Sequence, residues 1–262
     1  MFIRGYIMNL YEAIYTRKTV RQFNQKPLEV VTMLHFKNFI KAVLGEEYCK
    51  GCSVDIIDTL SSNKKAKGMF KVIAPYYFVV QCDNNTKGFI QAGLVAQMLV
   101  LYLTSKGIGT CYQGNVTMNT IKNDSKLCEG IVVAFGYSNE SVHREWEKAK
   151  RQKLKDIVYF KEEINSDMEH MLESARLAPS AFNLQPWRFV VYHNRIHIFL
   201  RKELFPLKKM KQTNGINIGI VLSHLLIGAE ELWIKASVTQ VDSLAERQLK
   251  NHEYVTSVLL EI

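Results

Sequence analysis

The chain has 262 residues, of which 47% are hydrophobic and 23% are charged, and its mean hydropathy is −0.08. This composition is typical of a folded globular protein and excludes a disordered chain, a collagen-like fibre and a disulfide scaffold. Lys and Arg number 34 against 25 Asp and Glu, which gives a net charge of +9. A basic surface attracts phosphorylated cofactors, nucleic acid or acidic lipid, and charge alone does not choose among them.

Cysteine usage and apolar runs predict the compartment. The five cysteines are odd in number and scattered, which favours a reducing cytosol over a secreted disulfide framework. The longest apolar run, at residues 92–103, is interrupted by Gln97 and is shorter than the ~18 residues of a membrane-spanning helix. The N-terminus has no signal-peptide pattern. We therefore expect a cytoplasmic protein that does not enter a membrane.

Two helices are predicted before residue 50. Asn9 and Glu12 resemble a capping box, which predicts a helix over residues 9–17. Pro27 favours the start of a second helix. The apolar positions of that second helix are Val30, Val31, Leu34, Ile40 and Val43.

Helices and strands continue to alternate along the chain. Apolar runs predict strands at residues 54–57, 76–82, 131–135, 188–192, 196–200 and 255–260. Helices are predicted at residues 90–106, where Gly107 stops the helix, at 166–178, where Ser166 and Glu169 form a capping box, and at 219–234. The basic run at residues 144–155 connects the two halves of the chain, and we interpret it as a solvated face.

Two of the predicted helices correspond to each other. Residues 93–108 and 219–234 align without a gap, with Gly93 on Gly219 and Leu99 on Leu225, at a separation of 126 residues. Buried helices commonly share such a pattern, so the alignment alone is weak evidence of duplication.

A cationic segment follows the first predicted helix. Residues 17–21 read Arg-Lys-Thr-Val-Arg, and the Arg, Lys and Thr side chains could bind a phosphate through charge-assisted hydrogen bonds. Cations are also common at helix C-termini because they offset the helix dipole, and composition alone favours that interpretation.

A second informative segment lies at residues 178–189, between a predicted helix and a strand. Its Ser180, Asn183 and Gln185 offer donors and acceptors that could contact the edge of a planar heterocycle. The alternative is a loop between prolines in which Ser and Asn bond only to their own backbone.

Together the two segments resemble the signatures of the FMN-dependent nitroreductase family. Residues 13–23 resemble that family's A-I-x-x-R-R-S-V-R-x-F, and residues 174–191 resemble its A-P-S-x-x-N-x-Q-P-W, which is the more specific match. The stretches at 74–80, 106–111 and 135–138 agree further. The resemblance implies an α+β fold, the nitroreductase-like fold, with a mixed β-sheet flanked by helices in each half.

The spacing of the signatures departs from an ordinary family member. The two segments are roughly 160 residues apart here instead of a few tens, and the expected place in the first half reads GEEYCKGC. When the halves are superposed in sequence, Glu47 falls at Ser180 and Lys50 at Asn183. The resemblance is to a family whose ordinary members are intertwined homodimers with FMN at the interface. The resemblance therefore implies the single-chain, pseudo-dimeric TM nitroreductase-like subfamily, with fused halves at residues 1–155 and 156–262.

The same resemblance implies a set of FMN-binding residues. In the family, one segment contacts the FMN phosphate, ribityl chain and pyrimidine edge, and its counterparts here are Arg17, Lys18, Thr19 and Arg21. A second phosphate contact of the family corresponds to Arg151. Pro179, Ser180 and Asn183 would lie against the ring from the other half, with Gln185 in a structural role. Gln113 and Gly114 fall where the family offers a backbone N–H toward flavin N5. The expected FMN-binding residues are Arg17, Lys18, Thr19, Arg21, Gln113, Gly114, Arg151, Pro179, Ser180 and Asn183.

The implied activity is NAD(P)H-dependent oxidoreduction through FMN. A reduced nicotinamide would deliver hydride, and a nitroaromatic or quinone would take the electrons in a ping-pong cycle without a catalytic side chain. We expect a monomer with one FMN per chain. A non-catalytic flavin-binding protein and a basic nucleic-acid-binding protein are the alternatives. Cys49 and Cys52 could be a redox pair, but no second pair stands at zinc-ligand spacing, so no metal is expected.

Overall fold

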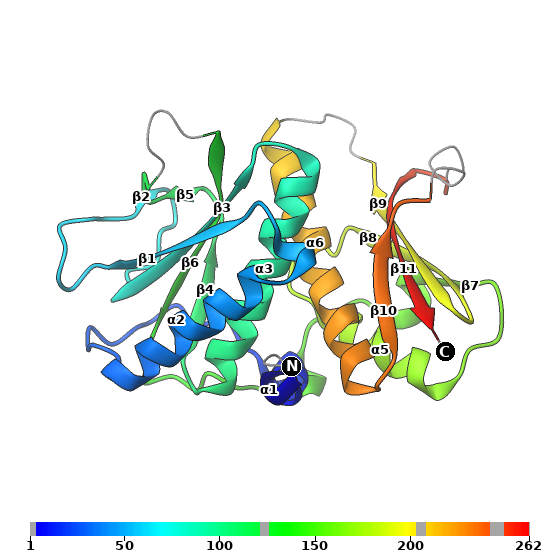
Figure 1. Ribbon diagram of the computed structural model, residues 1–262, viewed down its shortest axis with the longest axis horizontal. Helices are drawn as coiled ribbons and strands as arrows, with labels where there is room; N and C mark the ends of the chain where they lie inside the picture. The colour runs from blue at the N-terminus through cyan, green and yellow to red at the C-terminus, as the bar shows by residue number, and fades with distance from the viewer. Residues whose placement is uncertain (1–3, 121–125, 203–207, 242–248, 262) are drawn as a thin grey trace.

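Two β-sheets lie on either side of a central pair of helices (Figure 1). The computed structural model describes residues 4–120, 126–202, 208–241 and 249–261. The central pair consists of α3 (Thr86–Ser105) and α6 (Lys208–Glu231). The α+β class predicted from the sequence is confirmed.

The first sheet has the strand order β1-β3-β6-β4, and all its neighbours are antiparallel. Its strands are β1 (Ser53–Asp58), β3 (Tyr76–Asp83), β4 (Gly109–Gln113) and β6 (Leu127–Gly136). The short strands β2 (Lys67–Gly68) and β5 (Val116–Thr117) pair with each other beside it. Helices α1 (Arg4–Thr16) and α2 (Val30–Leu44) precede this sheet in the chain.

The second sheet has the strand order β10-β11-β9-β8-β7, with one parallel pair, β7 and β8. Its strands are β7 (Val158–Phe160), β8 (Trp187–Tyr192), β9 (Arg195–Arg201), β10 (Lys235–Thr239) and β11 (His252–Glu261). The helices of this part are α4 (Leu154–Ile157) and α5 (Ser166–Arg176), with 3₁₀ turns at Trp146–Lys148 and Ala181–Asn183.

The two sheets have the same topology around their helices. In the first, two antiparallel neighbours (β1, β3) are followed by α3, an edge strand (β4) and an inner strand (β6). In the second, β8, β9, α6, β10 and β11 follow in the same order and occupy the same relative positions. Each sheet takes its strands from one side of residue 155.

The central helices touch through glycines that are 126 residues apart. A Cβ at Gly93 would collide with the carbonyl oxygen of Ile216, and a Cβ at Gly219 would collide with that of Ile90. Ile90 and Ile216 are themselves 126 residues apart. Such a reciprocal contact is typical of an interface around a two-fold axis, and glycine allows the backbones to approach this closely.

The predicted strands are confirmed, but several helix boundaries are wrong. α1 begins at Arg4 instead of Asn9, α3 at Thr86 instead of residue 90, and α6 at Lys208 instead of Gly219. The N-cap of α5 is Asn165 and not Ser166, because the Asn165 side chain accepts the Met168 N–H at 2.9 Å. Polar residues in the first turns of α3 and α6 conceal these helix starts in the sequence.

The predicted apolar face of α2 is also partly wrong. Val30, Val31 and Leu34 are 87%, 51% and 54% exposed, whereas Ile40 and Val43 are buried with Phe36 and Phe39. The helix is buried through the i, i+3, i+4, i+7 set that begins at Phe36. The strands β4 and β10 were not predicted, because their sequences, GTCYQ and KASVT, are not continuous apolar runs. The strands β2, β5 and β7, of two or three residues each, were not predicted either.

Helix α3 is long and apolar enough to cross a membrane by length and composition, and it is the one such helix in the described residues. However, 83% of its apolar window is buried inside the fold. This burial is typical of the core helix of a globular protein.

Candidate functional site

The arginine segment follows α1 as an extended segment with two isolated β-bridges. Arg17 forms an antiparallel bridge with His143, and Thr19 forms a parallel bridge with Thr110 of β4. The Val20 N–H donates to the Thr110 carbonyl at 3.0 Å. Side chains in an extended segment alternate between its two sides, so Arg17 and Thr19 share one side.

The predicted cations of this segment have different environments. Arg17 is only 5% exposed, and its Nη1 donates to Thr19 Oγ1 at 3.3 Å. Lys18 is half-buried and lies 3.9 Å from Glu140. Arg21 is exposed, and its charge acts on the Cys111 thiol, whose pKa is raised mainly by burial and lowered by Arg21. Arg17 is therefore the cation that the fold holds most firmly.

Arg17 belongs to a cluster of four arginines. Burial lowers its pKa to about 10, and the next contribution is the charge of Arg144. The pKa of Arg151 is lowered to about 9, mainly by burial and then by the charges of the other three. The fourth member, Arg176, donates from Nε to the two carboxylate oxygens of Glu173 at 2.7 and 2.9 Å.

Arg144 lacks the partners that its burial requires. Its Nε and Nη2 are buried without a hydrogen-bond partner anywhere in the described part of the chain. Unpaired buried cations are unfavourable, because burial removes water that a protein partner then has to replace. An anion with several acceptor oxygens would satisfy these donors, and a phosphate has that chemistry.

The second predicted segment is a tight loop after α5. Ser180 Oγ accepts the Gln185 N–H at 2.9 Å, and the Ala181 N–H donates to Asn217 Oδ1 of α6 at 3.0 Å. Phe182 and Asn183 have φ values of 51° and 57°, in the left-handed region. This backbone leaves Phe182 91% exposed. Pro179 and Ser180 are half-buried.

Arg151 connects this loop to the arginine cluster. Its Nη1 donates to Asn183 Oδ1 at 3.0 Å, and its Nε donates to the carbonyl oxygens of Leu177 and Ala178. Asn183 Nδ2 also donates to the carbonyl of Lys150, the residue before Arg151, at 2.9 Å. The structure therefore brings Arg17, Arg151 and Asn183 into one neighbourhood, although Arg17 and Asn183 are 166 positions apart.

Gln185 has the structural role expected from the sequence. It is only 4% exposed, and its Oε1 accepts the Gln152 N–H at 2.8 Å. Gln185 thus joins the loop after α5 to the chain beside Arg151.

Gln113 and Gly114 lie at the end of β4. The Gln113 side chain is buried, accepts the Val72 N–H at 2.8 Å and donates to the carbonyls of Cys111 and Tyr112. At Gly114 a Cβ would meet nothing within 4 Å. Within the described residues no hydrogen bond joins this pair to Ser180 or Asn183, so the structure does not connect them directly to the loop after α5.

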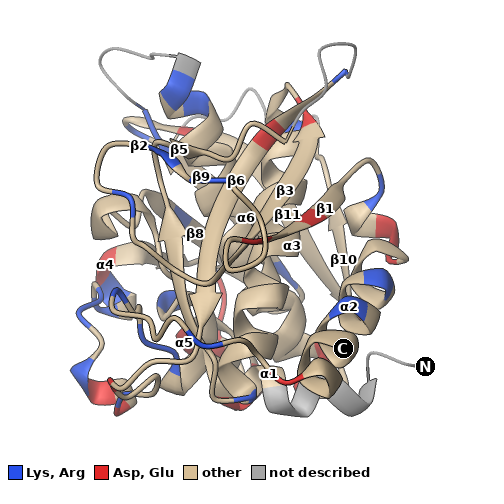
Figure 2. Cartoon of the chain, turned by 90° about the vertical axis from the view of Figure 1, so that its left-hand side faces the viewer, with Lys and Arg blue, Asp and Glu red and all other residues tan. Residues whose placement is uncertain are grey.

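Sequence reasoning missed Arg144 and Arg176. The prediction that the run at residues 144–155 is a solvated face is wrong for two of its members. Arg144 Nε and Nη2 are buried, and Arg151 donates to Asn183 and to the carbonyls of Leu177 and Ala178. Lys and Arg positions are frequent along the ribbon around α4 in Figure 2, where this run lies. A run of cations does not reveal which members face inward, because that depends on the packing of α1 and α5.

A neutral hydrogen-bond chain lies behind the cluster. Tyr112 donates to Gln97 Oε1 at 2.7 Å, Gln97 Nε2 lies 2.8 Å from His224 Nε2, and His224 Nδ1 lies 2.7 Å from the Ser174 carbonyl. Burial, aided by the nearby arginine charges, lowers the pKa of His224 to about 3. Burial raises the pKa of Tyr112, against the opposing effect of Arg17. His224 is the satisfied core residue that its position in an apolar helix predicted.

None of the predicted site residues lines the cavity of about 1240 Å³ that lies between α3, α6 and β9–β11. Within the described residues, no three His, Cys, Asp or Glu side chains are arranged to hold a metal ion. The five cysteines are free thiols.

Comparison with known proteins places this geometry in a family. Residues 9–229 match the model of the family described as "Putative TM nitroreductase". No curated protein matches the sequence.

The solved structures include several similar chains. A crystal structure from Thermotoga maritima, described as a "putative nitroreductase", is 21% identical with a TM-score of 0.67 and covers 97% of this chain and 94% of its own. A nitroreductase family protein from Clostridium difficile 630 is 14% identical with a TM-score of 0.46 and covers 58% of this chain and 97% of its own. An FMN-dependent nitroreductase from Clostridium difficile R20291 is 16% identical with a TM-score of 0.39 and covers 54% and 96%.

The family match extends over most of the chain and includes both predicted signature segments, and the Thermotoga maritima structure shares the fold over nearly the whole length. The predicted nitroreductase-like fold is confirmed, and the chain belongs to the TM nitroreductase family.

Proposed function

We propose that this chain is an FMN-dependent oxidoreductase of the nitroreductase type. In this proposal NADH or NADPH supplies the electrons, and a nitroaromatic, a quinone or a similar molecule takes them in a ping-pong cycle. Membership of a nitroreductase family supports the reaction class. The observation that carries the cofactor is the pair of buried, unpartnered nitrogens of Arg144 beside Arg17 and Arg151.

The arginine cluster fits the phosphate of FMN. Arg17 and Arg151 would contribute fixed guanidinium groups, Arg144 its two unpartnered N–H groups, and Thr19 a hydroxyl. Each hydrogen bond between a cation and a phosphate oxygen contributes about 1.5–3 kcal/mol. Riboflavin lacks the phosphate, so this arrangement favours FMN over riboflavin.

The remaining predicted residues fit a planar ring. Asn183 is exposed and has both side-chain groups near Arg151. Pro179 and Ser180 present a half-buried surface beside it. The open space at Gly114 allows a planar group to approach that backbone closely. Lys18, which is half-buried, and Arg21, which is exposed, belong to the same segment as Arg17.

Bound FMN supplies hydride-transfer chemistry that amino-acid side chains lack. The residues of the chain therefore need only bind and orient it and set the local charge. Arg17 and its neighbours provide a positive environment that stabilises negative charge without reorganisation. Tyr112 and His224 are held neutral by burial, so they do not compete for the arginine charges.

We further propose one FMN site per chain, in a monomer made of two fused halves at residues 1–155 and 156–262. The repeated sheet topology and the reciprocal glycine contacts support the duplication. The arginine segment occurs only in the first half and the Pro-Ser-x-x-Asn loop only in the second, so one site can form. A cytoplasmic location fits the free cysteines.

An absorption spectrum with an anaerobic reduction tests the function. We expect the purified protein, supplied with FMN, to show a flavin band that NADH or NADPH bleaches and that a nitroaromatic or quinone restores. If the protein binds flavin but neither nucleotide reduces it, the alternative of a non-catalytic flavin-binding protein would be supported. A protein that does not quench FMN fluorescence would contradict the proposal entirely.

A matched pair of variants tests the placement. Asn183→Ala should weaken FMN binding or slow its reduction, because Asn183 holds Arg151 at 3.0 Å. Glu47→Ala, at the position of the first half that aligns with Ser180, should do neither. Equal effects of the two substitutions would contradict the assignment of the loop after α5.

A further inference from the structure

We propose that the cavity between α3, α6 and β9–β11 binds a second ligand, a small amphipathic monoanion such as a medium-chain carboxylate. The cavity has a volume of about 1240 Å³ and shares no residue with the proposed FMN site. The proposal therefore stands independently of the flavin.

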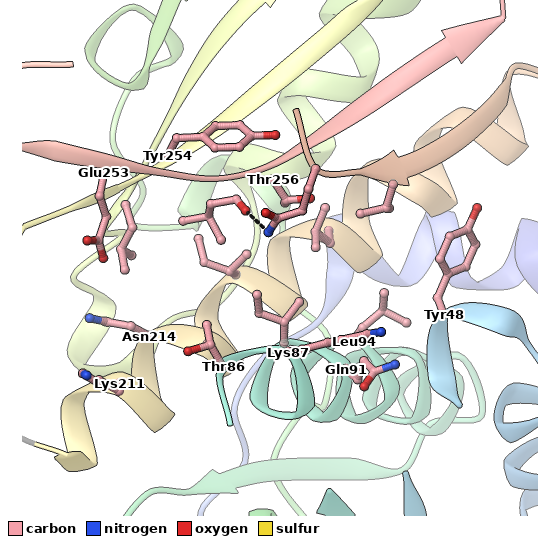
Figure 3. A pocket seen from close by; sticks show the side chains of 18 of the residues that line it. Tyr48, Thr86, Lys87, Gln91, Leu94, Lys211, Asn214, Glu253, Tyr254 and Thr256 are labelled. Carbon is pink, nitrogen blue, oxygen red and sulfur yellow. Dashed lines mark hydrogen bonds between the residues drawn. The ribbon is translucent and has the colours of Figure 1, made fainter. Parts of the chain in front are cut away.

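The interior of the cavity is apolar. Figure 3 shows side chains of α3 and α6 on one side facing those of β11 on the other. Leu94 of α3, Ile218 and Leu222 of α6 and Leu200 of β9 are almost fully buried at its base. An apolar chain placed here would remain in contact with hydrocarbon instead of water, which is favourable by about 25 cal/mol for each Å² removed from water.

Exposed cations surround this interior. Lys87 lies in the first turn of α3 and Lys211 in the first turn of α6. Both belong to the lining, as does Arg201 at the end of β9. The lining contains fewer carboxylates than cations, namely Glu47 and Glu253. Glu47 forms an ion pair with Lys50, so Glu253 is the other acid that a ligand would meet. An acidic group on the ligand would thus meet cations at the rim while its apolar body enters the cavity.

Hydrogen-bonding groups in the wall are already engaged, which favours a ligand with a single polar end. Gln240 Nε2 donates to the Val255 carbonyl at 2.9 Å, and Tyr48 donates to the Ala236 carbonyl at 3.2 Å. The Tyr254 hydroxyl accepts the Val241 N–H at 2.9 Å. A highly polar ligand would therefore find few free partners in the wall.

The cavity is related to the proposed FMN site by the repeat. Thr239 and Gln240 line it and stand 126 positions after Gln113 and Gly114, and Lys50 falls where the second half has Asn183. The cations of the cavity, Lys87, Lys211 and Arg201 among them, are exposed, whereas the arginine cluster is buried at Arg17 and half-buried at Arg144 and Arg151. The space of a second site is thus present, but the residues that fit an FMN phosphate are not, so a different anion suits it.

Isothermal titration with dodecanoate tests the proposal on the full-length, FMN-loaded protein. We expect one dodecanoate per chain, with weaker binding of dodecylamine, which has the opposite charge, and of butanoate, which lacks the apolar body. Dodecylamine binding as tightly as dodecanoate, or no dodecanoate binding at millimolar concentration, would overturn the proposal.

Charge-reversal variants locate the site. The double variant Lys87→Glu, Lys211→Glu should weaken dodecanoate binding by about tenfold or more, since two attractions become repulsions. The matched control Lys37→Glu, Lys41→Glu makes the same charge change on the exposed face of α2 and should leave the affinity within about twofold. Equal losses in both variants would show a non-specific charge effect and refute the site. FMN affinity should be unchanged in both, which separates this test from that of the proposed function.

Discussion

Two basic regions of the molecule differ in how their cations are packed. Arg17 is almost fully buried, Arg144 and Arg151 are half-buried, and two nitrogens of Arg144 are buried without a partner in the described part of the chain. Around Lys87 and Lys211 the ammonium groups are exposed at the rim of a cavity. Exposed charges are screened by salt and water, whereas buried or partly buried charges are screened much less. In our two proposals, burial, and not the net charge of +9, therefore distinguishes the FMN phosphate site from the weaker anion site.

The largest expected effect concerns His224, a buried imidazole that is kept neutral by burial and by the nearby arginine charges. Its folded pKa is about 3 against an ordinary value of 6.5. Between these two pH values the unfolded chain therefore binds a proton that the folded chain does not bind. The free energy of unfolding falls as the pH falls through this range. At pH 4 the loss from this group is about 3 kcal/mol.

Urea unfolding of the wild type and of His224→Gln at pH 7 and pH 4 measures this loss. The variant should lose less stability on acidification, because Gln can bond both neighbours without titrating. His170→Gln, at an exposed helix position, should behave as the wild type. A wild type and a His224→Gln variant with equal acid sensitivity would show that His224 is not held neutral.

The next effect contrasts the two basic regions directly. Arg144→Ala should weaken FMN binding by about 1.5–3 kcal/mol without lowering the stability of the flavin-free protein, since Arg144 Nε and Nη2 have no partner to lose. Lys211→Ala should leave FMN affinity unchanged. Fluorescence quenching gives the affinities and thermal unfolding gives the stabilities. A parallel loss of affinity in both variants would mean that FMN responds only to overall charge.

The next prediction tests the interface between the central helices α3 and α6, where the two halves meet. Gly219→Ala should destabilise the fold by about 1–3 kcal/mol, because its Cβ would collide with the Ile90 carbonyl. Gly114→Ala has open space and should change stability little. Chemical denaturation measures both. A tolerated Gly219→Ala would indicate that the backbones of α3 and α6 are not in contact.

The smallest effect concerns the equivalent C-terminal turns of α3 and α6. Gly107 and Trp233 are 126 residues apart and have φ values of 70° and 61°. Both turns have matching backbone bonds, from Ile108 to Leu103 and from Ile234 to Ala229. A bulky residue is strained in this left-handed region, so Trp233→Gly should raise the free energy of unfolding by up to about 1 kcal/mol. A decrease would show that contacts of the indole outweigh the strain.

Local patterns in the sequence predicted much of the fold and part of the site. Strands such as β3 and β9 are continuous apolar runs. The two signature segments contain Arg17 and Asn183, the same family resemblance pointed to Arg151, and the fold brings these three residues together. Arg144 was not predicted, because its inward direction depends on how the chain after β6 packs on α1. The cavity was not predicted either, since it forms only where α3, α6 and the second sheet meet. Val30 and Val31 were predicted to face the core but are exposed, because apolar spacing alone does not reveal which face of a helix is covered by the rest of the fold.

A parallel titration of the protein with FMN and with riboflavin tests the central claim most directly. If the buried arginines hold the phosphate, FMN should bind at one equivalent per chain and more tightly than riboflavin by at least one charge-assisted contact, about 1.5–3 kcal/mol or roughly 10- to 150-fold. Equal affinities for FMN and riboflavin, or two FMN per chain, would contradict the assignment of the arginine cluster as the single phosphate site.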